Sequence, residues 1–163
     1  MPAPDITDLA ARIIADYTAR GLKIVTAESC TGGLVAAALT EIPGASAVVE
    51  RGFVTYSNDA KVEVLAVMPE LLQVSGAVSA DTAEEMAQGA LEFSRADVAV
   101  SVTGIAGPDG GTMLKPVGLV FFGIARRNGV RMHYRCDFKG DRAAIRMQAA
   151  HEALRLLHSI VED

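Results

Sequence analysis

Residues 22–40 read LKIVTAESCTGGLVAAALT, and this stretch decides the fold. Residues 22–27 form a short, mostly apolar run, which predicts a β-strand. The apolar residues after the two glycines predict a helix that reaches about residue 40. The residues between them, ESCTGG, form a tight turn. A strand, a tight turn and a helix in succession are typical of an α/β protein.

Helices and strands alternate on both sides of this unit. The patterns predict helices over residues 6–17, 58–67, 79–94 and from 141 to the end, and strands over 47–56, 98–103, 117–125 and 130–139, with an irregular stretch over 68–78. Ser79 is a plausible N-cap, and Gly21 ends the first helix. Asn128-Gly129 predicts a hairpin between the last two strands, which makes at least one strand pair antiparallel. We therefore expect one domain over residues 1–163, an α/β/α sandwich with a mixed sheet of about five strands and a C-terminal helix.

The composition excludes several classes of protein. Half of the 163 residues are hydrophobic and 21% are charged, which is typical of a compact folded chain and excludes disorder. Fifteen Lys and Arg against 20 Asp and Glu give a net charge of −5, which argues against nucleic acid or an acidic membrane as a partner. No apolar run approaches the roughly 20 residues of a membrane span, and the first residues, MPAPD, lack the features of a signal peptide. We expect a cytoplasmic protein, and its high apolar content favours a homo-oligomer, with a dimer as the first choice.

The two cysteines are too few for a disulfide framework, which fits a reducing compartment. Cys136 lies on the apolar side of an alternating strand, so we expect a packed thiol. The three histidines, at positions 133, 151 and 158, are remote in sequence from the glycine-rich turns. This position does not favour a Ser-His-Asp triad. No Cys/His spacing matches a zinc site, and the glycines match neither a dinucleotide fingerprint nor a P-loop. We expect no metal and no cofactor.

Ser29 is the first candidate for chemistry. Its hydroxyl would emerge beside free backbone N–H groups, which can hold an oxyanion or a phosphate, although Ser29 or Thr31 could equally serve only as a helix cap. Cys30 is the competing nucleophile. With histidine implausible, the base is a lysine, a tyrosine or a carboxylate. Lys61, in the first turn of its predicted helix, suits that role if burial lowers its pKa, whereas a solvated lysine is the plain alternative.

Three further features could bind a ligand. Glu28 could carry a proton or orient an amide, or could be an ordinary surface carboxylate. The segment over residues 103–112 is glycine-dense, which suits close approach to a ligand but also suits a wide connection. Lys115, before Pro116, offers a fixed cation, and Arg142 could reach a phosphate or pair with an acid.

Six ordered motifs together resemble the CinA C-terminal domain family over nearly the whole chain. They are TAESCTGG at residues 26–33, YSNDAK at 56–61, GAVS at 76–79, TGIAGP at 103–108 with GGT at 110–112, KPVG at 115–118 and GDR at 140–142. The resemblance implies an α/β/α domain with a mixed five-stranded sheet. It also implies nicotinamide-nucleotide amidohydrolase activity, in which nicotinamide mononucleotide becomes nicotinic acid mononucleotide and ammonia, with a place in pyridine nucleotide recycling.

The resemblance also assigns roles to residues. It places the nucleophile on Ser29 and the general base on Lys61, with Tyr56 close to both. Many family members carry a further N-terminal domain, and we expect this chain to be the stand-alone form. Three departures stand out: Asp109 where glycine is frequent, Met113-Leu114 in place of a more polar pair, and Ala66 in place of a common glycine.

The resulting hypothesis is a serine–lysine hydrolysis of the carboxamide. N–H groups near Cys30, Thr31 and Gly32 would stabilise the oxyanion, and Tyr56 would relay a proton to the departing ammonia. The predicted substrate-binding residues lie in the two glycine-containing turns and at the start of the last helix: Glu28, Cys30, Thr31, Gly32, Gly33, Thr103, Gly104, Ile105, Ala106, Gly107 and Arg142. The rival hypotheses are a non-catalytic nucleotide-binding or regulatory module and an amidase or esterase for another small amide.

Overall fold

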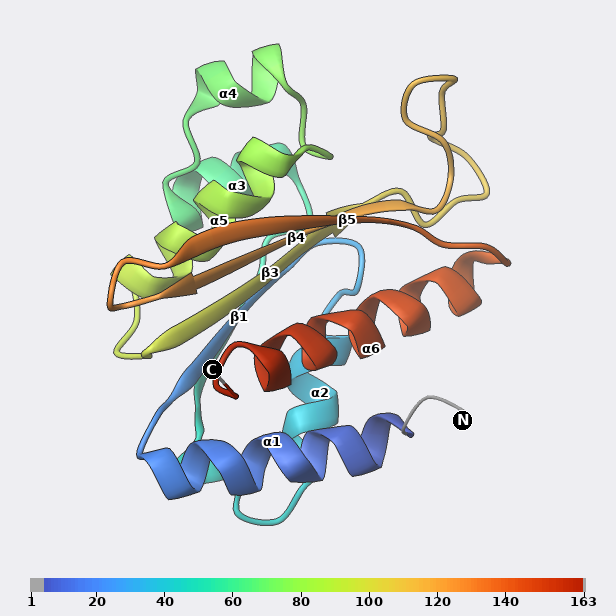
Figure 1. The fold of residues 1–163 in the computed structure, drawn as a ribbon. Helices are drawn as coiled ribbons and strands as arrows, with labels where there is room; N and C mark the ends of the chain where they lie inside the picture. Colours follow the sequence, from blue (N-terminus) through green and yellow to red (C-terminus); the bar gives the residue numbers. More distant parts are fainter. Residues whose placement is uncertain (1–4, 163) are drawn as a thin grey trace.

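The computed structural model describes residues 5–162 as a sheet between two layers of helices (Figure 1). The strands are β1 (Ile24–Glu28), β2 (Val49–Val54), β3 (Val98–Gly104), β4 (Leu119–Arg126) and β5 (Arg131–Asp137). The helices are α1 (Ile6–Arg20), α2 (Leu34–Thr40), α3 (Asn58–Leu65), α4 (Pro69–Val74), α5 (Ala80–Glu92) and α6 (Arg142–Ser159), with a 3₁₀ turn, η1, at Ala45–Ala47. The predicted α/β/α sandwich is confirmed.

The five strands form one mixed sheet in the order β2-β1-β3-β4-β5. Strand β1 is parallel to both β2 and β3, whereas β4 is antiparallel to β3 and to β5. The predicted hairpin through Asn128-Gly129 is therefore the β4–β5 pair. Because β1, β2 and β3 run in the same direction, their carboxyl ends meet at one edge of the sheet, which is where open α/β sheets hold their sites.

Helices cover both faces of the sheet (Figure 1). Helices α1, α2 and α6 lie on one side and α3, α4 and α5 lie on the other. The larger core cluster fills the first side and includes Tyr17, Phe122 and Leu154, and the smaller one, around Met86, fills the second. All five residues of β1 are buried, as expected of a strand covered on both faces.

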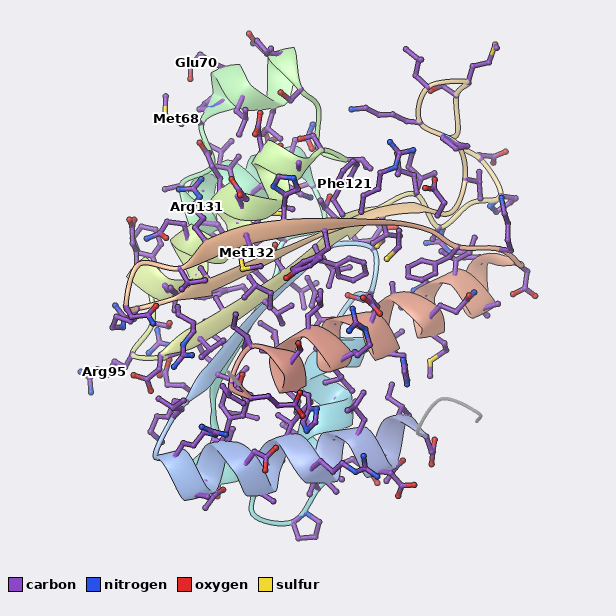
Figure 2. All side chains as sticks on the ribbon, in the orientation of Figure 1. Met68, Glu70, Arg95, Phe121, Arg131 and Met132 are labelled. Carbon is purple, nitrogen blue, oxygen red and sulfur yellow. The ribbon has the colours of Figure 1, made fainter. Side chains whose placement is uncertain are left out.

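The edge strand β5 follows the predicted alternation with one exception. Cys136 and Tyr134 are half-buried and pack against the larger core, which confirms the packed position of the Cys136 thiol. Met132, expected on the same apolar side, is 38% exposed. Figure 2 shows its neighbour Arg131 on the side of α5, where its Nε lies 3.5 Å from Oε2 of Glu84.

Local signals in the sequence fix several element ends. Gly21 ends α1 with φ of 66°, and the Ser79 hydroxyl accepts a hydrogen bond from the N–H of Thr82 at the start of α5. The prediction of an irregular stretch over residues 68–78 was wrong, because α4 occupies Pro69–Val74. This helix has six residues and no fully buried side chain, so its apolar spacing is too short to detect. Within residues 5–162, no helix has the length and apolar character needed to cross a membrane.

Candidate active site

The side chains of Ser29 and Lys61 meet at the carboxyl edge of the sheet. Ser29 directly follows β1, and its N–H donates to the carbonyl of Val102 in the neighbouring strand β3. Lys61 lies in α3, which the hydroxyl of Ser57 caps by accepting from the N–H of Ala60. The Nζ of Lys61 lies 2.9 Å from the Oγ of Ser29. Ser29 and Lys61 are 32 residues apart in sequence, and the fold brings the alcohol of one into direct contact with the amine of the other.

Lys61 is buried, with 1% of its surface exposed. Burial disfavours the charged ammonium and lowers the pKa of Lys61 from 10.5 to about 8. Its Nζ lies 2.8 Å from the carbonyl oxygen of Thr55 and 3.2 Å from that of Tyr56. In this arrangement the Nζ donates to the Oγ of Ser29 as well, and the Ser29 hydroxyl donates to the carbonyl of Tyr56 at 3.4 Å. Loss of one proton from the Nζ would leave a lone pair that can accept the proton of Ser29. The solvated-lysine alternative is therefore wrong, and the position suits a general base.

Cys30 has surroundings unlike those of a reactive thiol. The side chain is buried, and burial raises the pKa of the Cys30 thiol to about 11, an increase that the charges of Lys61 and Arg146 only partly offset. A thiol with this pKa stays protonated at neutral pH, and the thiolate is the nucleophilic form. Between the two candidate nucleophiles, the electrostatics favour Ser29.

Glu28 holds the turn that follows β1. Its carboxylate is buried and accepts four hydrogen bonds, from the hydroxyl of Thr31 at 2.6 Å and from the N–H groups of Gly33, Val35 and Ala36 at 3.2, 2.9 and 3.1 Å. These donors would otherwise be buried without partners at the start of α2. The surface-carboxylate alternative for Glu28 is wrong, and its oxygens contact the protein rather than a cavity.

A cavity of about 170 Å³ opens over the serine and lysine. Its lining residues are Ser29, Cys30, Tyr56, Lys61, Ala77, Val78, Thr103, Gly104, Ala106 and Arg142. The hydroxyl of Thr103 donates to the carbonyl of Ala77 at 2.8 Å and so ties β3 to the segment before α5. A further hollow of about 250 Å³ between α1, α2 and α6 is mostly apolar and holds no nucleophile.

Arg142, at the start of α6, closes one side of this cavity. One terminal nitrogen, Nη1, donates to the carbonyl of Gly107 at 2.7 Å, and Nη2 donates to the hydroxyl of Tyr56 at 3.1 Å. Arg142 therefore links the glycine-rich loop to the segment that precedes α3. Its partners are not acids, so the alternative in which Arg142 pairs with a carboxylate is wrong.

Six of the residues expected to bind substrate lie around the cavity without lining it. Gly107 faces Arg142, Ile105 pairs its backbone with that of Gly118 and Leu119, and Glu28, Thr31, Gly32 and Gly33 form the turn beneath Ser29. The N–H of Gly32 donates to the carbonyl of Ser29 at 3.0 Å and is thus not available to an oxyanion, contrary to expectation. Ala77 and Val78 line the cavity and were not expected there, although the GAVS motif marked their segment.

No histidine lines this cavity. His133 lies on β5 beside Glu84, and His158 lies between Asp16 and Glu162. Within residues 5–162, no group of three or more His, Cys, Asp or Glu side chains has a metal-binding arrangement. The proton chemistry available in the cavity is that of a lysine and a tyrosine.

The fold and the site together define an α/β/α protein with a serine–lysine pair at the carboxyl edge of its sheet. The family model of the CinA C-terminal domain matches residues 6–161. The chain belongs to this family, as its motifs predict.

Individual relatives agree with this assignment. The chain is 50% identical over 157 residues to the nicotinamide-nucleotide amidohydrolase PncC of Shigella flexneri, a match that covers 96% of this chain and 95% of the relative. It is 52% identical over 142 residues, 87% of this chain, to a competence-damage inducible protein of Caldicellulosiruptor saccharolyticus, but there it spans 34% of the relative's length. The crystal structure of the competence/damage inducible protein CihA from Agrobacterium tumefaciens superposes with a TM-score of 0.95 at 53% identity and covers 98% of both chains.

Proposed function

We propose that this chain hydrolyses the carboxamide of nicotinamide mononucleotide to nicotinic acid mononucleotide and ammonia. The observation that carries the proposal is the 2.9 Å contact between the Nζ of buried Lys61 and the Oγ of Ser29. The Shigella flexneri relative matches this chain over nearly the full length of both proteins, and its name supports this substrate class.

In the first step Lys61 takes the hydroxyl proton as the Oγ of Ser29 bonds to the carboxamide carbon. The carbonyl oxygen becomes an oxyanion, and backbone N–H groups of the turn after Ser29 stabilise it. The C–N bond then breaks. The amine leaves as ammonia after receiving the proton held by Lys61. The hydroxyl of Tyr56, expected to relay this proton, accepts from Arg142 instead and is assigned no transfer. The product of this step is an ester on Ser29.

In the second step water attacks that ester. Neutral Lys61 removes a proton from the water, the tetrahedral intermediate collapses, and the proton returns to the Oγ of Ser29. Nicotinic acid mononucleotide leaves, and the enzyme is restored. Every proton transfer uses a group that lines the cavity, so the cycle requires no group from outside the chain except water.

The size of the cavity suggests how the nucleotide lies. A space of about 170 Å³ accommodates the pyridine ring and its amide, so we place the ribose and phosphate at the cavity mouth. Arg142 is exposed and lies at that mouth, and it is the cation we assign to the phosphate. The glycine-rich loop after β3 borders the same opening.

A comparison of three substrates tests the proposal. Ammonia release is measured with nicotinamide, its riboside and its mononucleotide, for wild type and for Arg142→Met. We expect the mononucleotide to be the best substrate and Arg142→Met to raise its KM by about tenfold or more while changing the riboside less. Equal use of riboside and mononucleotide would indicate an amidase for another small amide. Stabilisation by the mononucleotide without ammonia release would indicate a non-catalytic nucleotide-binding module.

A further inference from the structure

One wall of the cavity comes from the segment that joins α4 to α5. Ala77 and Val78 of this segment line the cavity. Helix α4, which precedes them, has no fully buried side chain, and residues 75–79 are all only half-buried. Because burial gives the segment little support, its position depends on its hydrogen bonds.

Side chains donate to three successive carbonyls of this segment. The carbonyl of Ser75 accepts from the Nζ of Lys115 at 2.6 Å. The carbonyl of Gly76 accepts from two hydroxyls at the start of α5, and that of Ala77 accepts from the hydroxyl of Thr103 in β3. The donors to Gly76 and Ala77 thus belong to the sheet and its covering helix, whereas Lys115 belongs to the loop between β3 and β4.

The β3–β4 loop, residues 105–118, extends from the sheet on the side that carries α4 (Figure 1). Residues 108–114 of this loop are all exposed. A turn closes behind them, in which the N–H of Thr112 donates to the carbonyl of Lys115 at 2.8 Å and the N–H of Lys115 donates to the Thr112 hydroxyl at 3.0 Å. This turn fixes the backbone from which the Lys115 side chain extends.

Lys115 joins the two segments. Among the hydrogen bonds of residues 5–162, its contact with Ser75 is the one that connects the β3–β4 loop to residues 75–79. The carbonyl of Ser75 lies at the C-terminal end of α4, where unpaired carbonyls favour a cation. Both segments border the same cavity, since Ala106 of the loop also lines it.

The backbone beside the ammonium is shaped to receive it. Gly76 has φ of 78°, a conformation that favours glycine, and a side chain there would place its Cβ 3.1 Å from the Nζ of Lys115. Lys115 itself is half-buried and does not line the cavity. Its ammonium therefore contacts the outer side of the wall to which Ala77 and Val78 belong.

We propose that Lys115 is a positioning residue that holds the β3–β4 loop against the segment of Ala77 and Val78, and so fixes the shape of the cavity before substrate binds. This inference rests on the proposed function. A site that is already ordered binds its ligand with a smaller entropic cost. Lys115 has no hydrogen bond to Ser29 or Lys61, so its loss should weaken binding and leave the chemical step unchanged.

The test compares Lys115→Met and Lys115→Gln with the control Lys139→Met, an exposed lysine outside the site. Glutamine keeps a polar group, but its amide nitrogen is one bond nearer the backbone than the Nζ of lysine, so both variants lose the contact. Lys115→Arg restores a charged donor. For each protein we measure kcat and KM for nicotinamide mononucleotide, kcat/KM for the riboside, and the urea midpoint of unfolding.

We expect Lys115→Met and Lys115→Gln to raise KM for the mononucleotide by about three- to tenfold, with kcat within about twofold of wild type. The kcat/KM for the riboside falls by the same factor, because the cavity wall contacts the part that the two substrates share. Lys115→Arg recovers part of the affinity, and Lys139→Met keeps the wild-type values.

Three results would overturn the inference while the proposed function stands. One is a wild-type KM in Lys115→Met or Lys115→Gln, even with a lower urea midpoint, which would show a role in stability alone. Another is a loss confined to the mononucleotide, which would show that Lys115 contacts the phosphate directly. The third is a lower kcat at unchanged KM. A wild-type protein that releases no ammonia would overturn the proposed function, and this inference with it.

Discussion

The Nζ of Lys61 lies 2.9 Å from the Oγ of Ser29, and both side chains are buried, with 1% and 8% of their surfaces exposed. A lysine in this position can exchange a proton with the serine directly. The cause lies in the topology, because the turn after β1 and the first turns of α3 meet at the same edge of the sheet.

Removal of the amine tests its role as base. We expect Lys61→Met to lower kcat for nicotinamide mononucleotide by about 10³-fold, as other losses of a base or nucleophile do. Lys61→Arg should not restore activity, because a guanidinium stays protonated. The control is Lys139→Met, an exposed lysine outside the site, with wild-type kinetics expected. A Lys61→Met enzyme within tenfold of wild type would show that another group takes the proton.

The lowered pKa of Lys61 predicts the pH dependence of the reaction. The base acts in its neutral form, whose fraction grows as pH rises through about 8. We expect kcat/KM to rise about tenfold per pH unit below pH 8 and to level off above it. Measurement of ammonia release from pH 6 to 10 gives the midpoint. A midpoint near the usual 10.5 of lysine, or a flat profile, would contradict the neutral buried amine.

The carboxylate of Glu28 should be important for stability. The side chain of glutamine has one acceptor oxygen, and its amide NH2 is a donor that would face the backbone N–H donors of the turn. We expect Glu28→Gln to lower the free energy of unfolding in urea by about 2–4 kcal/mol. Glu41→Gln, at the exposed end of α2, is the matched control and should change little. Equal midpoints for the two variants would show that the four hydrogen bonds of Glu28 contribute little.

One departure from the family pattern carries conformational strain. Ala66 follows α3 with φ of 57°, a left-handed conformation that glycine adopts without a steric penalty. We expect Ala66→Gly to raise the free energy of unfolding by about 0.5–1 kcal/mol. Ala15→Gly, the same change at an exposed position in the middle of α1, should instead lower it by a similar amount. A destabilised Ala66→Gly protein would mean that the alanine side chain contributes more by packing than it costs in strain.

Much of the fold follows from local patterns in the sequence. The strand, turn and helix around Ser29, the capping residue Ser79 and the Asn-Gly hairpin are short-range signals, and each appears at the expected place. Helix α4 was missed because its six residues, four of them exposed and two half-buried, give almost no periodicity. The exposure of Met132 was missed because the alternation of apolar and polar residues shows which face of a strand a side chain lies on. It does not show whether another element covers that face.

The candidate site is less accessible to sequence reasoning. Lys61 was identified through its motif, but its burial is a tertiary property that the helix pattern does not contain. Arg146, which donates to the carbonyls of Cys30 and Thr31, was not expected at this turn because it lies in an ordinary amphipathic helix. One signal was present: Arg146 follows Arg142 by one helical turn, so both point from the same face of α6 toward the site.

The most direct test of the account compares Ser29→Ala with Cys30→Ala in an assay of ammonia release from nicotinamide mononucleotide, without added metal. We predict that wild type releases ammonia, that Ser29→Ala is slower by about 10³-fold or more, and that Cys30→Ala keeps most of the wild-type rate. A Ser29→Ala enzyme that keeps most of its rate while Cys30→Ala loses it would contradict the assignment of Ser29 as nucleophile.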